Sequence, residues 1–382
     1  LTERRNTGSL KWDVTERELP MWVADMDFET APEIREAIRE RAAHGIFGYN
    51  IVTEDWYDAY IGWWSRRHHI TFERDWLIFC TGVVPAISSA VRKLTTVGEN
   101  VLVQTPVYNI FFNSIRNNGR NILESPLVYD GREYHIDFAD LEKKLSDPQT
   151  TLMLLCNPHN PVGKIWNRET LEKIGELCAK HHVLVLSDEI HCDMTDPGYE
   201  YIPFASVSET CRENSITCIA PTKTFSIPGI QTAAVMVPNP VIRHKLNRGL
   251  NTDEVAEPNS FAVCAAVAAF EKGEPWLEEL RQYLADNKQL VRDFVERELP
   301  AICVVPSHAT YLLWLDCGYV THNATELVHF IREHSGLYLT EGEEYGKPGK
   351  KFIRLNTACP RARLEEGLNR LRDSVRAYAE KR

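Results

Sequence analysis

Four short segments carry polar side chains directly after apolar runs of the sequence. QTPVYNIFF (104–112) follows the first run, CNPHNPVG (156–163) the second, SDEIHCD (187–193) the third and APTKTFSIPGIQ (220–231) the fourth. In open parallel sheets ligands bind at the carboxyl ends of the strands, so we expect these segments to meet at one edge of one sheet. They supply an aromatic ring, an amide, a carboxylate, an imidazole and an amine: Tyr108, Asn160, Asp188, His191 and Lys223.

These groups together match a ligand with a flat ring, a protonatable ring nitrogen, a phenolic oxygen and an aldehyde, and pyridoxal phosphate has all four. A lysine after a buried strand is a candidate Schiff-base nucleophile, because a low-polarity site depresses its pKa. At about 4 Å and an effective dielectric of about 20, Asp188 attracts a protonated ring nitrogen by about 4 kcal/mol, or roughly 3 pKa units. The sequence therefore predicts pyridoxal phosphate on Lys223, with its ring kept cationic by Asp188.

Other side chains are predicted to complete this cofactor site. Asn160 and His191 are expected to hydrogen-bond the ring oxygen, and Tyr108 to stack on the ring face. The turn CTGVVPAI (80–87) leads from a strand into a helix and offers free backbone N–H groups to the phosphate. The predicted phosphate ligands are Gly82, Val83, Val84 and the hydroxyl of Thr222.

An arginine near the carboxyl end is predicted to bind the substrate. KKFIRLNTACPR (350–361) places Arg354 in an alternating segment, which suits bidentate capture of a carboxylate. Each candidate alone also has a structural explanation, such as an N-cap for Asp188, core packing for Tyr108 or a surface ion pair for Arg354. Four motifs in order, each at the same end of a predicted strand, favour the joint functional interpretation.

Several other features are predicted to be structural. The pairs His68-His69 and His181-His182 fall at helix ends, where cations suit the helix dipole, and residues 341–351 resemble a solvated loop. The motifs GxGxxG, Gx4GK[ST], HExxH and GxSxG do not occur, which excludes the common dinucleotide, nucleotide, zinc-protease and serine-hydrolase functions. No metal site is predicted.

The elements that must position these residues are parallel strands joined by helices. The strands are predicted from apolar runs, as in sheets covered on both faces, and one helix is predicted to start at Asn167 as N-cap and another near Val83. A capping box, Thr30-Ala31-Pro32-Glu33, is predicted to open an N-terminal helix. The predicted strands are Val101–Val103, Thr151–Leu155, Val183–Leu186, Ser215–Ile219 and Ala233–Val237.

The flanks are richer in amphipathic helices, which indicates a second domain. We predict a large α/β domain at residues 45–275 and a smaller α+β domain built from both chain ends, residues 1–44 and 276–382. A long helix is expected after Gly273, then a strand at Tyr311–Leu315 and a final helix through Leu364 and Tyr378.

Composition narrows the function classes. The 382 residues carry 43 Lys and Arg against 54 Asp and Glu, a net charge of -11, so no global positive field favours nucleic acid. The ten cysteines form no CxxC pair and are expected to be reduced thiols. The N-terminal residues are charged where a signal peptide is apolar, and the longest apolar run, 261–270, is far short of the roughly 20 residues that span a bilayer. We expect a cytoplasmic protein without a membrane partner.

With these motifs in place, the whole chain resembles the fold-type I pyridoxal-phosphate enzymes of the class I/II aminotransferase superfamily. Within it, the sequence is most similar to the MalY/PatB-type cystathionine β-lyases, on the basis of ELPMWVADMDF (18–28), DEIH (188–191) and TKTFSIPGIQ (222–231). The resemblance implies a large domain with a mainly parallel seven-stranded sheet and a smaller domain. It also implies Lys223 as the cofactor lysine, Asp188 on the pyridinium nitrogen and Arg354 on the substrate carboxylate.

The resemblance further implies a homodimer with shared active sites, in which Tyr49 of FGYN (47–50) reaches the partner's phosphate. Asn160 is also expected to bind the substrate, and the side-chain pocket is expected to draw on Trp22, Val23, Asp25 and the partner subunit. Three positions depart from the broader superfamily pattern. Ala220 stands where a phosphate-binding serine is frequent, Gln231 where an arginine is frequent, and Asn109-Ile110 where Pro-Pro is common.

The expected reaction is β-elimination on an L-amino acid with a sulfur leaving group. Lys223 removes the Cα proton, thiolate leaves Cβ, and pyruvate and ammonia follow; cystathionine would give homocysteine, and other cysteine S-conjugates would follow the same path. An aminotransferase, acting on an L-amino acid and a 2-oxo acid, shares the early steps and stays open as an alternative. A noncatalytic cofactor-binding regulator is the remaining alternative.

Overall fold

The structure, a computed structural model, describes residues 2–381, and its largest sheet lies between residues 77 and 236. That sheet has seven strands in the spatial order β2-β10-β9-β8-β7-β3-β4. Its strands are β2 (Leu77–Cys80), β3 (Asn100–Val103), β4 (Asn121–Glu124), β7 (Thr150–Cys156), β8 (Leu184–Asp188), β9 (Ser215–Ile219) and β10 (Ala233–Met236).

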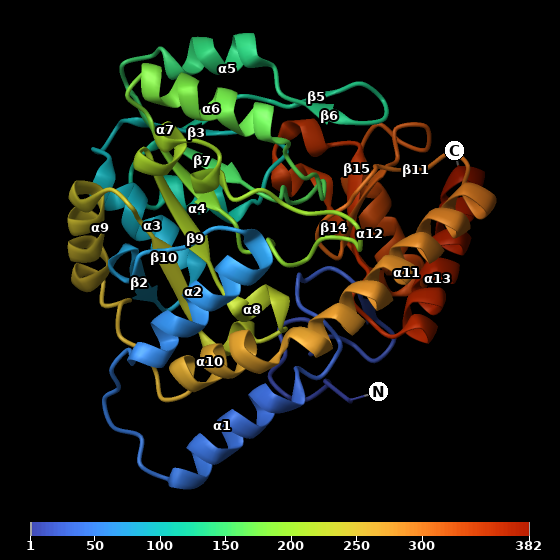
Figure 1. Ribbon diagram of the computed structural model, residues 1–382. Helices are drawn as coiled ribbons and strands as arrows, with labels where there is room; N and C mark the ends of the chain where they lie inside the picture. Colours follow the sequence, from blue (N-terminus) through green and yellow to red (C-terminus); the bar gives the residue numbers. More distant parts are fainter. Residues whose placement is uncertain (1, 382) are drawn as a thin grey trace.

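Helices cover both faces of this sheet (Figure 1). Alternate residues of β7 enter two different cores: Leu152 and Leu154 pack beneath the helices of one face, and Met153 and Leu155 beneath those of the other. Burial on both faces explains why the strands are apolar throughout. The helices of the first face are α3 (Val83–Leu94), α4 (Ile110–Arg116) and α9 (Pro240–Thr252), and those of the second are α5 (Phe138–Leu145), α6 (Arg168–Lys180) and α7 (Glu209–Glu213).

Strand direction in the sheet differs from the prediction at one strand. β10 pairs antiparallel with both β9 and β2, whereas the predicted strand at residues 233–237 was grouped with the parallel ones. The connection of residues 220–232 holds only the single turn α8 (Pro221–Thr224) and a 3-10 turn, not the longer helix that usually carries a parallel crossover. The other six strands run one way, so their carboxyl ends share one edge.

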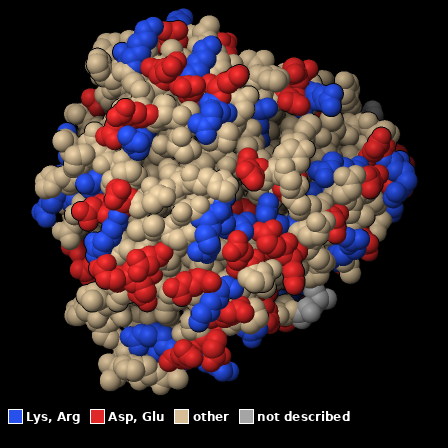
Figure 2. Space-filling view, in the orientation of Figure 1, with Lys and Arg blue, Asp and Glu red and all other residues tan. Residues whose placement is uncertain are grey.

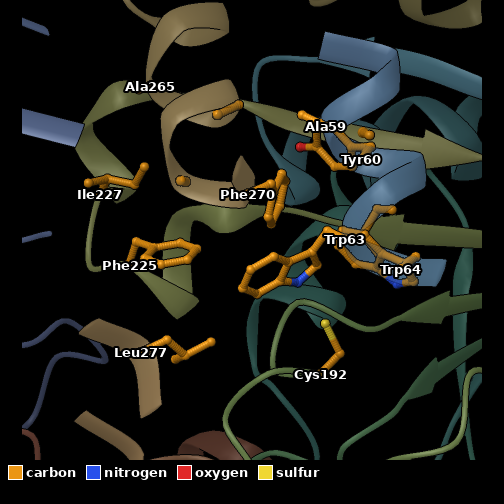
Figure 3. Packing of buried hydrophobic residues seen from close by; sticks show 14 of the residues in the cluster. Ala59, Tyr60, Trp63, Trp64, Cys192, Phe225, Ile227, Ala265, Phe270 and Leu277 are labelled. Carbon is orange, nitrogen blue, oxygen red and sulfur yellow. The ribbon is translucent and has the colours of Figure 1, made fainter. Parts of the chain in front are cut away.

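An aromatic cluster joins the sheet to two more helices, α2 (Glu54–His68) and α10 (Ala262–Lys272). The side chains of Tyr60, Trp63 and Trp64 lie on one face of α2 and are fully buried. Figure 3 shows them facing Phe270 of α10, with Phe225 beside Trp63. This packing ties α2 to the turn that follows β9.

A second, four-stranded sheet has the order β11-β12-β15-β14 and lies between residues 303 and 356. β1 (Leu19–Pro20) pairs with β13 (Leu337–Tyr338), which brings the N-terminal chain to this part of the molecule. In Figure 1 the long helix α11 runs from beside α10 toward the C-terminal helix α13. The elements are α11 (Glu274–Glu298), β11 (Cys303–Val304), β12 (Leu312–Asp316), α12 (Ala324–Ser335), β14 (Thr340–Glu341), β15 (Phe352–Asn356) and α13 (Arg361–Glu380).

Helix starts agree with the sequence in two cases and differ in one. α6 is capped by Asn167, whose Oδ1 accepts from the Thr170 amide at 2.8 Å, and α3 begins at Val83, as predicted. The predicted capping box is wrong: α1 (Pro32–His44) has Ala31 as its N-cap, and the Thr30 hydroxyl is buried without a partner among the described residues. Pro32 at the first position starts this helix instead.

The predicted domain boundaries stay a prediction. α1 packs along α10, while Trp12 and Leu19 belong to the core around β12, β15, α12 and α13. Within residues 2–381, none of the helices combines the length and apolar character that crossing a membrane requires. Figure 2 shows acidic and basic side chains interspersed over one face of the described molecule, with no continuous basic surface in that view.

Candidate active site

A cavity of about 290 Å³ opens at the carboxyl edge of the seven-stranded sheet. The turn after β2, the loops after β3, β7 and β8, and α8 after β9 all contribute to its wall. Parallel direction is what places these five connections at one edge. Nine residues predicted for the site line this cavity: Gly82, Val83, Val84, Tyr108, Asn160, Asp188, His191, Thr222 and Lys223.

Asp188 ends β8, is buried and lines the cavity. It lies two residues after Leu186, which packs beneath α3, so its carboxylate faces the same side of the sheet as the start of α3. Burial raises the pKa of Asp188 to about 7, against a lowering by Lys223. The one hydrogen bond to its carboxylate among residues 2–381 comes from the Ile190 amide at 3.2 Å. This carboxylate can therefore accept a further cationic N–H.

Lys223 lies in α8, the single turn that begins at Pro221. Burial, and after it the charge of Arg354, lowers the pKa of Lys223 to about 8. The amine donates a hydrogen bond to the Ala24 carbonyl oxygen. A lysine with this pKa has a sizeable neutral fraction near neutral pH, which makes it a nucleophile and a base.

Uptake of pyridoxal phosphate by the cofactor-free protein is expected to accelerate with rising pH, with a midpoint near pH 8. The uptake rate rises with pH because a higher pH removes the proton of Lys223, and only the neutral amine attacks an aldehyde. Stopped-flow absorbance across the pH range measures the rate, with the Lys223→Ala protein as control. A midpoint above about pH 10, the value of an ordinary lysine, would contradict this environment for Lys223.

The part of the cavity wall at the start of α3 is suited to an anion. Gly82 is the N-cap of α3 in extended conformation, and the first-turn amides of Val83 and Val84 have no partner within an α-helix. Such amides and the helix dipole attract phosphate. Gln231 also lines the cavity, whereas Ala220 is buried in the core. Neither Ala220 nor Gln231 supplies a charged phosphate ligand, so a charged ligand would have to come from another residue.

Three further polar residues of the cavity wall suit the edge and face of a ring. His191 is neutral, because burial and then the charges of Lys223 and Arg354 lower its pKa to about 3. Its Nδ1 is buried without a partner among the described residues. Asn160 and Tyr108 line the same cavity.

Arg354 lies just beyond the cavity, in the central strand β15 of the second sheet. Its neighbours Ile353 and Leu355 point into the core of that sheet, so alternation turns Arg354 toward the cavity side. Its Nη1 lies 3.4 Å from Asn160 Oδ1, and its Nη2 donates to the Trp22 carbonyl oxygen at 2.8 Å. Arg354 Nε is buried without a partner in residues 2–381, so the guanidinium has a donor to spare.

The N-terminal segment contacts Arg354 and Asn356 through its backbone, and the substrate pocket expected from its side chains stays a prediction. Trp22 and Val23 present carbonyl oxygens to Arg354 and to Asn356 Nδ2, the latter at 2.6 Å from the Val23 oxygen. The Trp22 ring stacks on Tyr338 with centroids 4.7 Å apart. Neither residue lines the cavity. Tyr49 is also outside it, fully exposed in this chain.

Two tyrosines near the site were missed. Tyr345 is buried and lies under the Arg354 guanidinium at 5.0 Å, and its carbonyl accepts from the Val107 amide. The prediction of a solvated loop at residues 341–351 is therefore wrong at Tyr345. The charged residues on both sides of Tyr345 in the sequence favoured an exposed loop, but this one aromatic side chain is buried. Tyr311 donates to the Ala24 carbonyl at 2.9 Å. The only signal for it was its place before the apolar run of β12.

The two histidine pairs lie at helix ends, as predicted. α2 ends at His68 with His69 as its C-cap, and His181 is the C-cap of α6. His68 also has a specific side-chain partner, because its Nε2 lies 2.8 Å from Asp193 Oδ1.

These observations fit pyridoxal phosphate. A buried carboxylate needs a cationic N–H, a buried amine of lowered pKa stands in the same cavity, and an imidazole nitrogen lacks a partner in the described chain. A volume of about 290 Å³ is close to the smallest pockets that bind small ligands, about 300 Å³. The free amides at the start of α3, after Gly82, suit a phosphate.

Comparisons with known proteins agree with this chemistry. A family model described as aminotransferase class I and II matches residues 19–371. Cystathionine beta-lyase PatB of Bacillus subtilis (strain 168) is 44% identical over 379 residues, which covers 98% of each chain. Cystalysin from Treponema denticola, which contains a pyridoxal 5'-phosphate cofactor, has a TM-score of 0.95 and 34% identity over 98% of each chain. The PLP-bound C-S lyase from Staphylococcus hominis has a TM-score of 0.92 and 32% identity over 98% of this chain and 97% of that one.

Proposed function

This chain belongs to the class I and II aminotransferase family, and we propose that it is a carbon–sulfur β-lyase that cleaves L-cystathionine or related cysteine S-conjugates. Its cofactor is pyridoxal phosphate. The observation that carries the proposal is the cavity in which Lys223 and Asp188 meet, with Arg354 at its border. Full-length similarity to a cystathionine β-lyase supports the choice of reaction.

When bound, the cofactor supplies an electron sink that stabilises negative charge on the substrate Cα. Arg354 holds the substrate carboxylate through its spare donors, which fixes the amino acid over the cavity. Lys223, in its neutral form, takes the proton from Cα. Asp188 supplies the negative charge that keeps the sink cationic.

Bond breaking completes the elimination. The Cα–H electron pair forms the Cα–Cβ double bond, and the Cβ–S bond breaks with its electron pair going to sulfur. The thiolate leaves as homocysteine when cystathionine is the substrate. Water then converts the remaining three-carbon amine to pyruvate and ammonia. With a pKa of about 8, Lys223 can give up the proton it has taken, which a departing group can accept.

The proposal includes a homodimer. The segment between α1 and α2 exposes apolar side chains, with Ile46 68%, Phe47 57% and Ile51 77% exposed. Apolar groups gathered on an exposed segment mark an interaction surface. Figure 1 shows this segment projecting from the body of the chain. Tyr49 within it would reach the partner's phosphate site and provide the ligand that Ala220 and Gln231 do not. Light scattering of the purified protein checks the dimer.

Product analysis separates the lyase from an aminotransferase. The holoprotein is given L-cystathionine, and pyruvate and free thiol are measured in the same sample. The lyase releases both in equal amounts. Amino transfer from an amino acid to a 2-oxo acid, with no pyruvate from cystathionine, would favour the aminotransferase instead. If the holoprotein showed neither activity, the chain would be a cofactor-binding protein without catalysis.

A further inference from the structure

Asp193 is a fully buried carboxylate that lies outside the cofactor cavity. Its Oδ1 accepts from Trp63 Nε1 at 3.0 Å and lies 2.8 Å from His68 Nε2. Its Oδ2 accepts from the Thr224 hydroxyl at 2.9 Å. Burial raises its pKa, but the bond to His68 and the charges of His68 and Arg67 bring the pKa below the ordinary value. Asp193 is therefore a charged acceptor whose oxygens are both in use.

The donors to this carboxylate come from two different elements. Trp63 and His68 belong to α2, which is anchored in the aromatic cluster. Thr224 belongs to α8 and directly follows Lys223. Asp193 thus joins the rigid helix α2 to the turn that carries the reactive lysine.

The lysine turn has few bonds of its own. α8 is only four residues long, and the next residue, Phe225, is bonded to Pro221 at 2.9 Å. Phe225 packs against Trp63 with ring centroids 5.8 Å apart, as Figure 3 shows. Thr224 is fully buried, so its hydroxyl cannot turn to solvent if the bond to Asp193 is lost. The turn is held in place by this bond, by the packing of Phe225 and by the hydrogen bond from the Ile227 amide to the Thr222 carbonyl oxygen at 3.0 Å.

We infer that Asp193 is a positioning residue that, through Thr224, fixes Lys223 relative to Asp188. The inference rests on the proposed role of Lys223. Asp188 is the last residue of β8 and Asp193 lies in the segment that follows directly, so the residue proposed to hold the cofactor ring and the residue that holds the lysine turn are close together on one piece of backbone. A misplacement of about 1 Å at a reacting group can cost about 100-fold in rate. The long side chain of Lys223 makes its amine sensitive to the orientation of α8.

The test uses Thr224→Val, which keeps the shape and removes the hydroxyl. Thr224→Ser keeps the hydroxyl and is the conservative rescue. Thr95→Val, at the C-cap of α3, removes another buried hydroxyl, which accepts from Arg120 Nε at 2.8 Å, and controls for stability alone. Thr224→Ala replaces the valine variant if that variant does not fold.

Three quantities are measured: the uptake rate of pyridoxal phosphate by cofactor-free protein, kcat and KM with cystathionine, and the thermal midpoint. We expect Thr224→Val to slow uptake and lower kcat by about 10-fold with KM unchanged, and Thr224→Ser to stay within about twofold of the parent protein. Thr95→Val is expected to lower the thermal midpoint and leave uptake within about twofold.

Uptake at the parent rate in Thr224→Val would overturn the inference, as would equal losses in the valine and serine variants. Uptake does not depend on which substrate the enzyme prefers. A failure of the proposed lyase activity would appear as absent pyruvate in the parent protein, with the uptake comparison still readable.

Discussion

A Lys223→Ala variant is expected to lose about 10⁴-fold in the rate of pyruvate release from cystathionine. The variant lacks both the amine that attacks the cofactor aldehyde and the base that takes the Cα proton. Lys223 is buried in the cavity with a pKa of about 8, which suits both tasks. A coupled assay for pyruvate measures the loss.

The exposed Lys245 on α9 offers a matched control for this variant. Lys245→Ala removes the same side chain far from the cavity and is expected to keep the parental rate. A Lys223→Ala protein that retained more than about a tenth of that rate would show that another group is the base. A different lysine would then have to bind the cofactor and take the Cα proton.

An Asp188→Asn variant is expected to turn over about 100- to 1,000-fold more slowly, with the loss in kcat. The reason is electrostatic: the carboxylate is worth about 4 kcal/mol, or roughly 3 pKa units, to a cationic ring nitrogen at about 4 Å. Asparagine keeps the size and loses the charge. Asp140, an N-terminal residue of α5 with Lys144 as its partner, gives a control by Asp140→Asn, whose turnover is expected to be unchanged.

The same Asp188→Asn change is expected to stabilise the cofactor-free protein. The pKa of Asp188 is about 7 in the folded chain and near 3.8 when unfolded, so the unfolded state loses its proton first as pH rises. Above about pH 7 both states are ionised, and burying the charge costs the folded state up to about 4 kcal/mol. Asparagine removes that cost at about pH 8, and the gain fades as the pH falls toward about 4.

Urea unfolding of the cofactor-free proteins at these two pH values checks the sign. A parent protein that is more stable than Asp188→Asn at about pH 8 would show that the carboxylate already has a strong partner in the folded chain. Lost turnover together with higher stability of the cofactor-free protein would show that the Asp188 charge destabilises the fold and serves ligand binding.

Much of the site could be predicted because it depends on strand direction. Asp188 and Lys223 each follow an apolar run, and parallel strands bring such ends together. The structure confirms that both line one cavity with Asn160 and His191. The roles given to these residues stay predictions until the variants are measured.

Other parts could not be predicted because they depend on distant contacts. The direction of β10 follows from how the chain turns after α8, which no local pattern states. The positions of Tyr345 and Thr224 matter through partners far along the chain, Arg354 and Asp193. Trp22 binds Arg354 through its backbone carbonyl oxygen. Because every residue type has such a carbonyl, no pattern in the sequence signals this contact.

The central claim is that the amine of Lys223 binds the cofactor covalently. Borohydride reduction of the holoprotein makes that bond permanent, and peptide mass spectrometry then locates the modified lysine. The account predicts a single phosphopyridoxyl group on Lys223, in the peptide that contains APTKTFSIPGIQ. A phosphopyridoxyl group on any other lysine, or a protein that binds pyridoxal phosphate without a reducible bond, would contradict it.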